Sequence, residues 1–149
     1  MSSRNENRVP PPARAGEQPD DIAPDGSQIR LLVDTSPDRS GATRASLCEV
    51  TLPAGRVSRP VWHRTVEEIW YVLAGRGDVW RCPPDAAPDQ VPPLPVAPGD
   101  ALVIPTGWRF QFRAGPGAPL RFLCYTSPPW PGADEAQPAD LGGLGPPTV

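Results

Sequence analysis

The chain has 149 residues, a length that suits a single domain with one hydrophobic core. Its formal net charge is −3 at pH 7, all 14 basic residues are arginine and no basic stripe stands out, so we expect no nucleic acid partner. Because the sequence contains no lysine, chemistry that proceeds through a lysine Schiff base, such as that of pyridoxal phosphate or of lysine aldolases, is excluded.

Proline and glycine divide the chain into a foldable centre and two extensions. The 24 prolines and 14 glycines crowd into residues 1–28, into residues 82–98 and into the tail after Ser127, where few apolar residues are available to bury. We therefore predict a proline-rich, flexible N-terminal segment over 1–28, a folded domain over 29–127 and a Pro/Gly-rich tail over 128–149. The N-terminus lacks the apolar segment of a signal peptide, and no apolar run reaches transmembrane length, which predicts a cytoplasmic protein with no membrane partner.

Period-two alternation of apolar and polar residues dominates the centre of the chain, as expected for strands with one buried face. In chain order, the predicted strands are residues 29–34, 44–52, 68–73, 78–82, 101–104, 108–113 and 120–126. The third and fourth of these form a predicted hairpin around Gly75-Arg76-Gly77. No stretch of ten or more residues has helical periodicity, so the fold class is predicted to be all-β, a sandwich or a barrel.

His63 is the only histidine of the chain, and it precedes a predicted strand that begins at Glu68. Alternation along that strand places Glu68 and Trp70 on the same face. The loop and the strand can therefore direct His63 and Glu68 into one cavity. The plainer interpretation is a loop histidine that hydrogen-bonds to its neighbours Arg64, Glu67 or Glu68.

Two glycine frames in this region resemble the motifs of the cupin family. The first cupin motif contains a glycine, a His-x-His pair, a glutamate and a second glycine, and the second contains a glycine, Pro-x-Gly, a histidine and an asparagine. The matching residues are Gly55, His63, Glu68 and Gly75 in the first motif and Gly99, Pro105 and Gly107 in the second. The resemblance implies a cupin-type jelly-roll β-barrel, flanked here by the proline-rich N- and C-terminal extensions.

The sequence departs from the cupin pattern at residues that, in the family, hold a divalent metal. Val61 stands where the pattern has its first histidine, Phe110 where it has its third, and Ala114 replaces the asparagine. If a metal is retained, only His63 and Glu68 remain as its ligands, whereas a catalytic metal generally needs three protein ligands. The sequence therefore predicts no definite cofactor. The alternative is a bound divalent metal, which would be iron, zinc, manganese or nickel.

Without a metal, the predicted cavity is an apolar pocket that contains one imidazole and one carboxyl group. Its expected lining residues are Val61, Trp70, Trp108, Phe110 and Phe112. Such surroundings raise the pKa of a carboxyl group and favour a neutral imidazole, which suits proton transfer near neutral pH. The alternative is that these large side chains are ordinary barrel core.

The resemblance and the pocket together predict a small-molecule enzyme of specialised metabolism. Cupin-like cyclases and isomerases of this size imply non-oxidative proton chemistry, that is cyclisation, dehydration or isomerisation of an apolar or aromatic substrate. His63 would be the general base or acid, and Glu68 would orient it or share its proton. Two alternatives stay open, a metal-dependent cupin oxygenase or lyase and a non-catalytic cupin that binds a small molecule.

Exposed strand edges in so small a barrel favour association with a second copy of the chain. Cupins commonly form dimers, so the resemblance also implies a homodimer. Trp130 lies in a proline-rich frame, and we expect its indole to pack against the barrel or against a second subunit.

Overall fold

The structure is a computed structural model that describes residues 9–149, so residues 1–8 of the expected N-terminal segment lie outside the described residues. The strands are β1 (Asp21–Ile22), β2 (Gln28–Val33), β3 (Ser46–Leu52), β4 (Val61–His63), β5 (Glu67–Ala74), β6 (Gly77–Cys82), β7 (Leu94–Val96), β8 (Ala101–Ile104), β9 (Arg109–Ala114), β10 (Leu120–Ser127) and β11 (Ala136–Pro138). Two 3₁₀ turns, Pro37–Arg39 and Pro88–Gln90, are the only helical elements between residues 9 and 149. In this part of the chain no helix is long and apolar enough to span a membrane.

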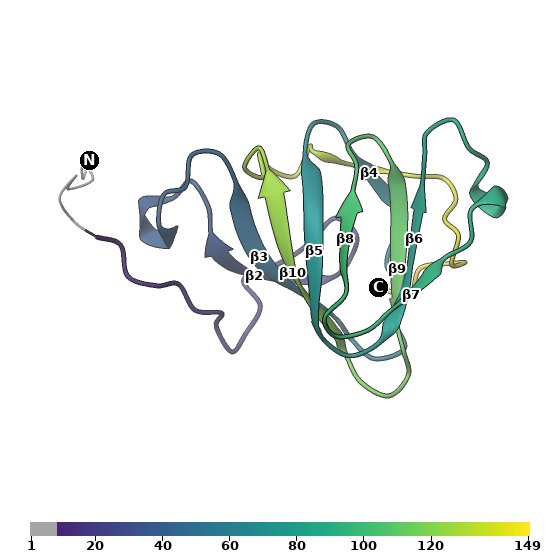
Figure 1. The fold of residues 1–149 in the computed structure, drawn as a ribbon, viewed down its shortest axis with the longest axis horizontal. Coiled ribbons are helices and arrows are strands. Elements are labelled where there is room, and N and C mark those ends of the chain that lie inside the picture. The colour runs from purple at the N-terminus through teal and green to yellow at the C-terminus, as the bar shows by residue number, and fades with distance from the viewer. Residues whose placement is uncertain (1–8) are drawn as a thin grey trace.

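The strands form two antiparallel sheets, which confirms the predicted all-β fold (Figure 1). One sheet has six strands in the order β1-β2-β3-β10-β5-β8, and the other has five in the order β11-β4-β9-β6-β7. The predicted hairpin of residues 68–73 and 78–82 does not form. The strand β5 pairs with β8 and β10, whereas β6 pairs with β7 and β9, so residues 75–76 carry the chain from one sheet to the other. At this connection Gly75 has a φ of 78°, and a Cβ there would lie 2.1 Å from the carbonyl oxygen of Pro119, so only glycine fits.

The core lies between the two sheets and is built from the alternate, inward-facing side chains of the central strands. The aromatic members pack closely: the rings of Trp70 and Phe122 stack at 4.1 Å between centroids, and Phe112 meets both rings edge-on. The largest core side chains with under 2% exposure include Phe110, Phe112, Phe122, Leu52 and Ile104. Burial on this scale is the main source of stability for a domain of this size.

Each proline-rich end contributes one short strand to the sheets, while residues 9–20 and most of residues 128–149 have no regular secondary structure. On the N-terminal side, β1 pairs with β2. On the C-terminal side, β11 pairs with β4, and the last residues cover the outer face of β9. Gln111 of β9 is fully buried there, and its amide donates to the Gly145 carbonyl and accepts from the Leu144 N–H. Hydrogen bonds to other strands thus hold these segments, which have few apolar residues of their own, against the barrel.

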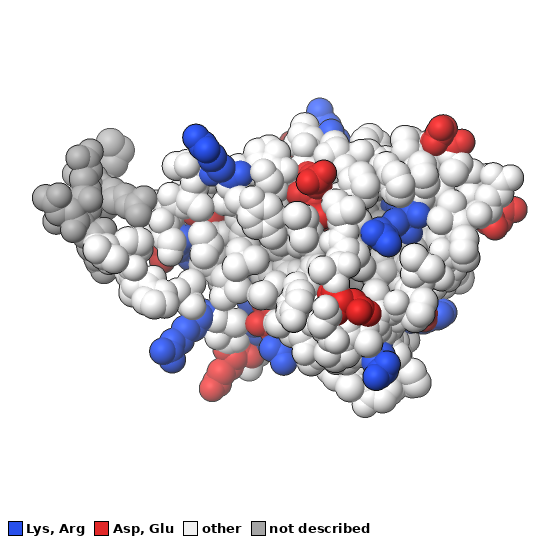
Figure 2. All heavy atoms as spheres, viewed as in Figure 1, with Lys and Arg blue, Asp and Glu red and all other residues white. Residues whose placement is uncertain are grey.

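The outer face of the six-stranded sheet carries exposed apolar side chains. Ile69, Tyr71 and Leu73 of β5, Val103 of β8 and Tyr125 of β10 are between 37% and 48% exposed. The middle of the face seen in Figure 2 accordingly shows few charged atoms. A contiguous apolar face of this kind is more typical of an interaction surface than of a surface in contact with water alone.

Candidate functional site

A cavity of about 710 Å³ opens between the inner face of the six-stranded sheet and the strand β4. Its walls come from β2, β3, β5 and β10 on one side, and from β4 and residues 130–136 on the other. The turn before β2 borders it as well. Most of the lining side chains are apolar, as in pockets that bind organic molecules.

His63 ends β4 and reaches into this cavity from the five-stranded sheet. It is 4% exposed, and its ring lies edge-on between the rings of Phe110 and Trp130, at 5.1 and 5.3 Å between centroids. Among the described residues, its Nδ1 is the only buried side-chain nitrogen or oxygen without a hydrogen-bond partner. Burial lowers the pKa of His63 to about 4, against a smaller opposite effect of Glu135, so the imidazole is neutral at physiological pH.

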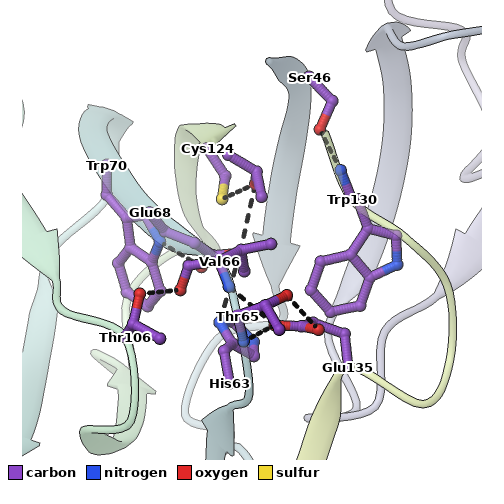
Figure 3. Close-up of polar contacts among 11 residues, drawn as sticks. Ser46, His63, Thr65, Val66, Glu68, Trp70, Thr106, Cys124, Trp130 and Glu135 are labelled. Carbon is purple, nitrogen blue, oxygen red and sulfur yellow. Dashed lines mark hydrogen bonds and ion pairs between the residues drawn. The ribbon is translucent and has the colours of Figure 1, made fainter. Parts of the chain in front are cut away.

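Glu68 projects into the same cavity from β5, in the opposite sheet (Figure 3). Its carboxyl group accepts hydrogen bonds from Trp70 Nε1 at 3.0 Å and from the Thr126 hydroxyl at 3.4 Å. Burial raises the pKa of Glu68 to about 7, although hydrogen bonds from Trp70, Cys124 and Thr126 act to lower it. The group is therefore largely protonated just below neutral pH, and can donate a hydrogen bond.

The Glu68 Oε2 atom lies 3.9 Å from His63 Nδ1. The contact is not a salt bridge at any pH, because His63 is protonated only below about pH 4, where Glu68 is neutral. The two groups approach from opposite sheets, His63 at the end of β4 and Glu68 as the second residue of β5. Glu68 pairs with Thr126 across β5 and β10, while Val61, two residues before His63, pairs with Phe110 across β4 and β9.

Four of the predicted site residues line the cavity together: His63, Glu68, Val61 and Trp70. Phe110 and Phe112 lie one layer deeper. Phe110 packs against the rings of His63 and Trp70, and Phe112 packs against Trp70 and Phe122, so both support the cavity from the core and are not among its lining residues.

Trp108 does not belong to the cavity. It lines a separate, smaller hollow of about 260 Å³ together with residues of β6, β7 and β8. The predicted strand 108–113 began one residue too early. The strand β9 begins at Arg109, and Trp108 still belongs to the turn through Gly107, whose φ is 82°. Its side chain therefore does not follow the inward pattern of Phe110 and Phe112.

Sequence reasoning missed several residues of the site. Trp130 was expected to pack against the barrel or a second subunit, and it packs against the barrel, but beside His63 itself. Cys48 and Cys124 are free thiols opposite each other on β3 and β10 in the cavity wall. Hydrogen bonding with Cys48 and burial raise the pKa of the Cys124 thiol well above its usual value, which disfavours the reactive thiolate. Glu135 had no sequence signal, since its segment has no strand periodicity.

The donors present do not fit the divalent metal that the cupin resemblance implies. His63 and Glu68 are two candidate ligands, and Val61 and Phe110 occupy positions where further ligands would be needed. Across residues 9–149 no group of three His, Cys, Asp or Glu side chains is arranged to hold a metal ion. Residues 9–149 of one chain therefore do not form a three-ligand catalytic site.

The Cupin domain family matches residues 48–126, which is more than half of the chain. The protein belongs to the cupin family. Of the strands that line the cavity, the match covers β4 and β5 and nearly all of β3 and β10, whereas β2 and residues 130–136 lie outside it. The two sheets are the expected jelly roll.

Several known proteins are similar to this chain in sequence or in fold, to different degrees. An uncharacterized protein of Methanocaldococcus jannaschii is 31% identical over 109 residues, which cover 73% of this chain and 79% of that protein. The polyketide cyclase RemF from Streptomyces resistomycificus is 29% identical, with 95% of this chain and 88% of that chain covered and a TM-score of 0.60. Oxalate decarboxylase from Bacillus subtilis is 15% identical with a TM-score of 0.69 over 88% of this chain, but this chain spans only 32% of its length. At that identity only the fold is shared.

Proposed function

We propose that this cupin is an enzyme that carries out acid–base chemistry without an oxidant on a neutral, largely aromatic substrate, by cyclisation, dehydration or isomerisation. The observation that carries the proposal is the unpaired Nδ1 of His63, buried in the cavity 3.9 Å from the Glu68 carboxyl group. A buried polar atom without a partner has lost its hydrogen bond to water, and this free-energy cost is not offset unless a ligand supplies another hydrogen bond.

The protonation states suit a base and an acid in one pocket. Between about pH 4 and pH 7 His63 is neutral and can accept a proton, while Glu68 is largely protonated and can donate one. Pairs of titratable groups whose surroundings move their pKa values in opposite directions are typical of such assignments. The Nδ1 atom acts as the base when the other ring nitrogen carries the hydrogen.

The proton transfers can be written in full for a substrate with a carbonyl group. His63 Nδ1 takes a proton from the carbon next to the carbonyl, while the Glu68 carboxyl group gives its proton to the carbonyl oxygen. A C–H and an O–H bond break, and an N–H and an enol O–H bond form. The enol can then attack a second carbonyl of the same substrate and close a ring, or return as an isomer. In isomerisation the imidazolium returns its proton to carbon and the enol O–H proton returns to the Glu68 carboxylate. In ring closure the enol O–H proton passes to the oxygen of the attacked carbonyl, and the proton on His63 passes to Glu68, so both groups become neutral again.

The charges around the cavity favour an uncharged substrate. No arginine is among the described residues that line it, and four carboxyl groups are: Asp21, Asp25, Asp34 and Glu68. An anionic ligand would lose its hydration without gaining a cationic partner. The similarity to the polyketide cyclase RemF, at 29% identity over most of both chains, supports cyclisation among the proposed reactions.

The test is hydrogen exchange at carbon. The protein is incubated in D₂O with a panel of neutral aromatic ketones and β-diketones, and deuterium at the carbon next to the carbonyl is followed by NMR. We expect His63→Asn and Glu68→Gln to slow the exchange by about 10²-fold or more, while Trp108→Phe, outside the cavity, leaves it unchanged. Exchange that persists in His63→Asn would contradict the proposal. Binding of the ketones without exchange in the wild type would instead favour a non-catalytic binding protein.

A further inference from the structure

The C-terminal arm, residues 130–138, contains a buried carboxylate that the acid–base step does not use. Glu135 is 4% exposed, although no arginine pairs with it in the described structure. Its Oε1 atom accepts hydrogen bonds from the backbone N–H groups of Thr65 and Val66, and its Oε2 atom accepts one from the Thr65 hydroxyl at 2.8 Å (Figure 3). The backbone carbonyl of Glu135 also accepts from the N–H of Arg64.

These bonds all go to the turn that joins the two groups of the proposed acid–base pair. Thr65 and Val66 follow His63, the last residue of β4, and precede Glu68, the second residue of β5. The other side of the turn is held by the Thr106 hydroxyl, which donates to the Val66 carbonyl. The C-terminal arm holds this turn through the hydrogen bonds of Glu135. Without them the buried N–H of Val66 would lose its acceptor.

The arm also touches His63 directly. Ala136 pairs with His63 in the ladder between β11 and β4, and the indole of Trp130 lies edge-on to the imidazole at 5.3 Å. The start of the arm is fixed to the opposite sheet, because the Trp130 N–H donates to the Ser46 hydroxyl at 3.0 Å. Trp130, Gly132, Ala133 and Ala136 all line the cavity. The arm therefore forms one wall of the pocket.

We propose that Glu135 is a positioning residue, which fixes the turn after His63 so that the imidazole faces Glu68, and that the C-terminal arm is an integral part of the site. The role of His63 in catalysis rests on the proposed function, whereas the orientation of its ring by Glu135 does not. Hydrogen bonding, and not negative charge, is the means. A glutamine at this position keeps an oxygen that can accept both backbone N–H groups, and its amide can donate to the Thr65 hydroxyl in place of accepting from it.

The experiment uses the NMR signals of the imidazole, which need no assignment because His63 is the only histidine of the chain. We expect Glu135→Ala to shift both carbon-bound ring proton signals, Glu135→Gln to restore them, and Glu67→Ala, an exposed carboxylate on the neighbouring strand, to leave them unchanged. Catalysed exchange in D₂O should fall about 10²-fold in Glu135→Ala, since small displacements of a catalytic group have effects of that size, and should recover in Glu135→Gln.

Three results would overturn the positioning role. The first is unchanged imidazole signals in a folded Glu135→Ala protein, and the second is signals in Glu135→Gln that match those of Glu135→Ala. If Glu135→Ala does not fold, the third is unchanged signals in the milder variant Glu135→Asp, whose shorter carboxylate cannot reach all three donors. A wild type that catalyses no exchange, combined with imidazole signals that shift in Glu135→Ala and recover in Glu135→Gln, would refute the proposed function and leave the positioning role standing.

Discussion

Replacing Glu68 by glutamine should change how the stability of the protein depends on pH. The pKa of Glu68 rises from its ordinary value of 4.5 in the unfolded chain to about 7 in the fold, because burial penalises the charged carboxylate. The folded state therefore binds more protons than the unfolded state between these two values. It follows that the contribution of Glu68 to the free energy of unfolding is fully present below about pH 4.5 and is lost as the pH rises through about 7.

The size of the effect follows from the shift. A displacement from 4.5 to about 7 corresponds to about 3 kcal/mol between the two ends of the range. His63 acts with the opposite sign, because its pKa falls from 6.5 to about 4, so its contribution is absent at acid pH and is gained as the pH rises to about 6.5. The two contributions nearly cancel in the wild type, and single substitutions separate them.

The assay is urea unfolding of the wild type and of Glu68→Gln at several values between about pH 4 and pH 8, compared pH by pH. Relative to the wild type, Glu68→Gln should gain about 3 kcal/mol across this range, and His63→Asn should lose a similar amount, most of it below about pH 6.5. The other titratable groups around Glu68, which are Asp25, Cys48 and Cys124, are common to all variants, so the differences isolate each group. A difference between wild type and Glu68→Gln that stays constant to within about 1 kcal/mol would refute the raised pKa, and with it the role of Glu68 as an acid.

Three other predictions follow from the site and the surface. Catalysed exchange should be maximal between about pH 4 and pH 7 and fall above this range as Glu68 ionises, and a rate that increases above pH 7 would assign the acid to another group. Metal analysis by mass spectrometry of untagged wild type and His63→Ala should find less than one equivalent of divalent metal in both, whereas stoichiometric metal that is lost with His63 would reveal ligands beyond Glu68. The homodimer expected from the sequence stays a prediction, and light scattering should give twice the monomer mass; a monomer at all accessible concentrations would contradict it.

Local patterns predicted seven of the eleven strands between residues 9 and 149 and the two polar groups of the site, but they missed β1, β4, β7 and β11, so that His63, expected on a loop, ends a strand. Alternation identified the buried face of β5, with Glu68 and Trp70, and the glycine frames placed His63 at the cavity. The same reasoning misplaced Trp108, because alternation holds only within a strand and the sequence does not mark the residue at which β9 begins.

The C-terminal contribution to the site could not be predicted in the same way. Glu135 reaches Thr65 and Val66 across a long separation in sequence, and the pairing of β11 with β4 depends on a sheet edge that exists only after the barrel has formed. Neither contact leaves a periodic pattern in residues 128–149. The strands β2 and β3, which supply much of the cavity wall, were predicted as strands, but nothing in their sequence indicates that they face His63.

The departures from the cupin pattern explain the chemistry that remains. Val61 and Phe110 stand where the resemblance places histidines, and the two residues face each other across β4 and β9. Their substitution removes two metal ligands and at the same time replaces polar groups by apolar ones beside His63, whose ring contacts that of Phe110. Burial is the cause that lowers the pKa of His63 and raises that of Glu68. The apolar residues that stand where the resemblance places metal ligands thus contribute to the burial that leaves His63 and Glu68 neutral, as the proposed acid–base pair requires.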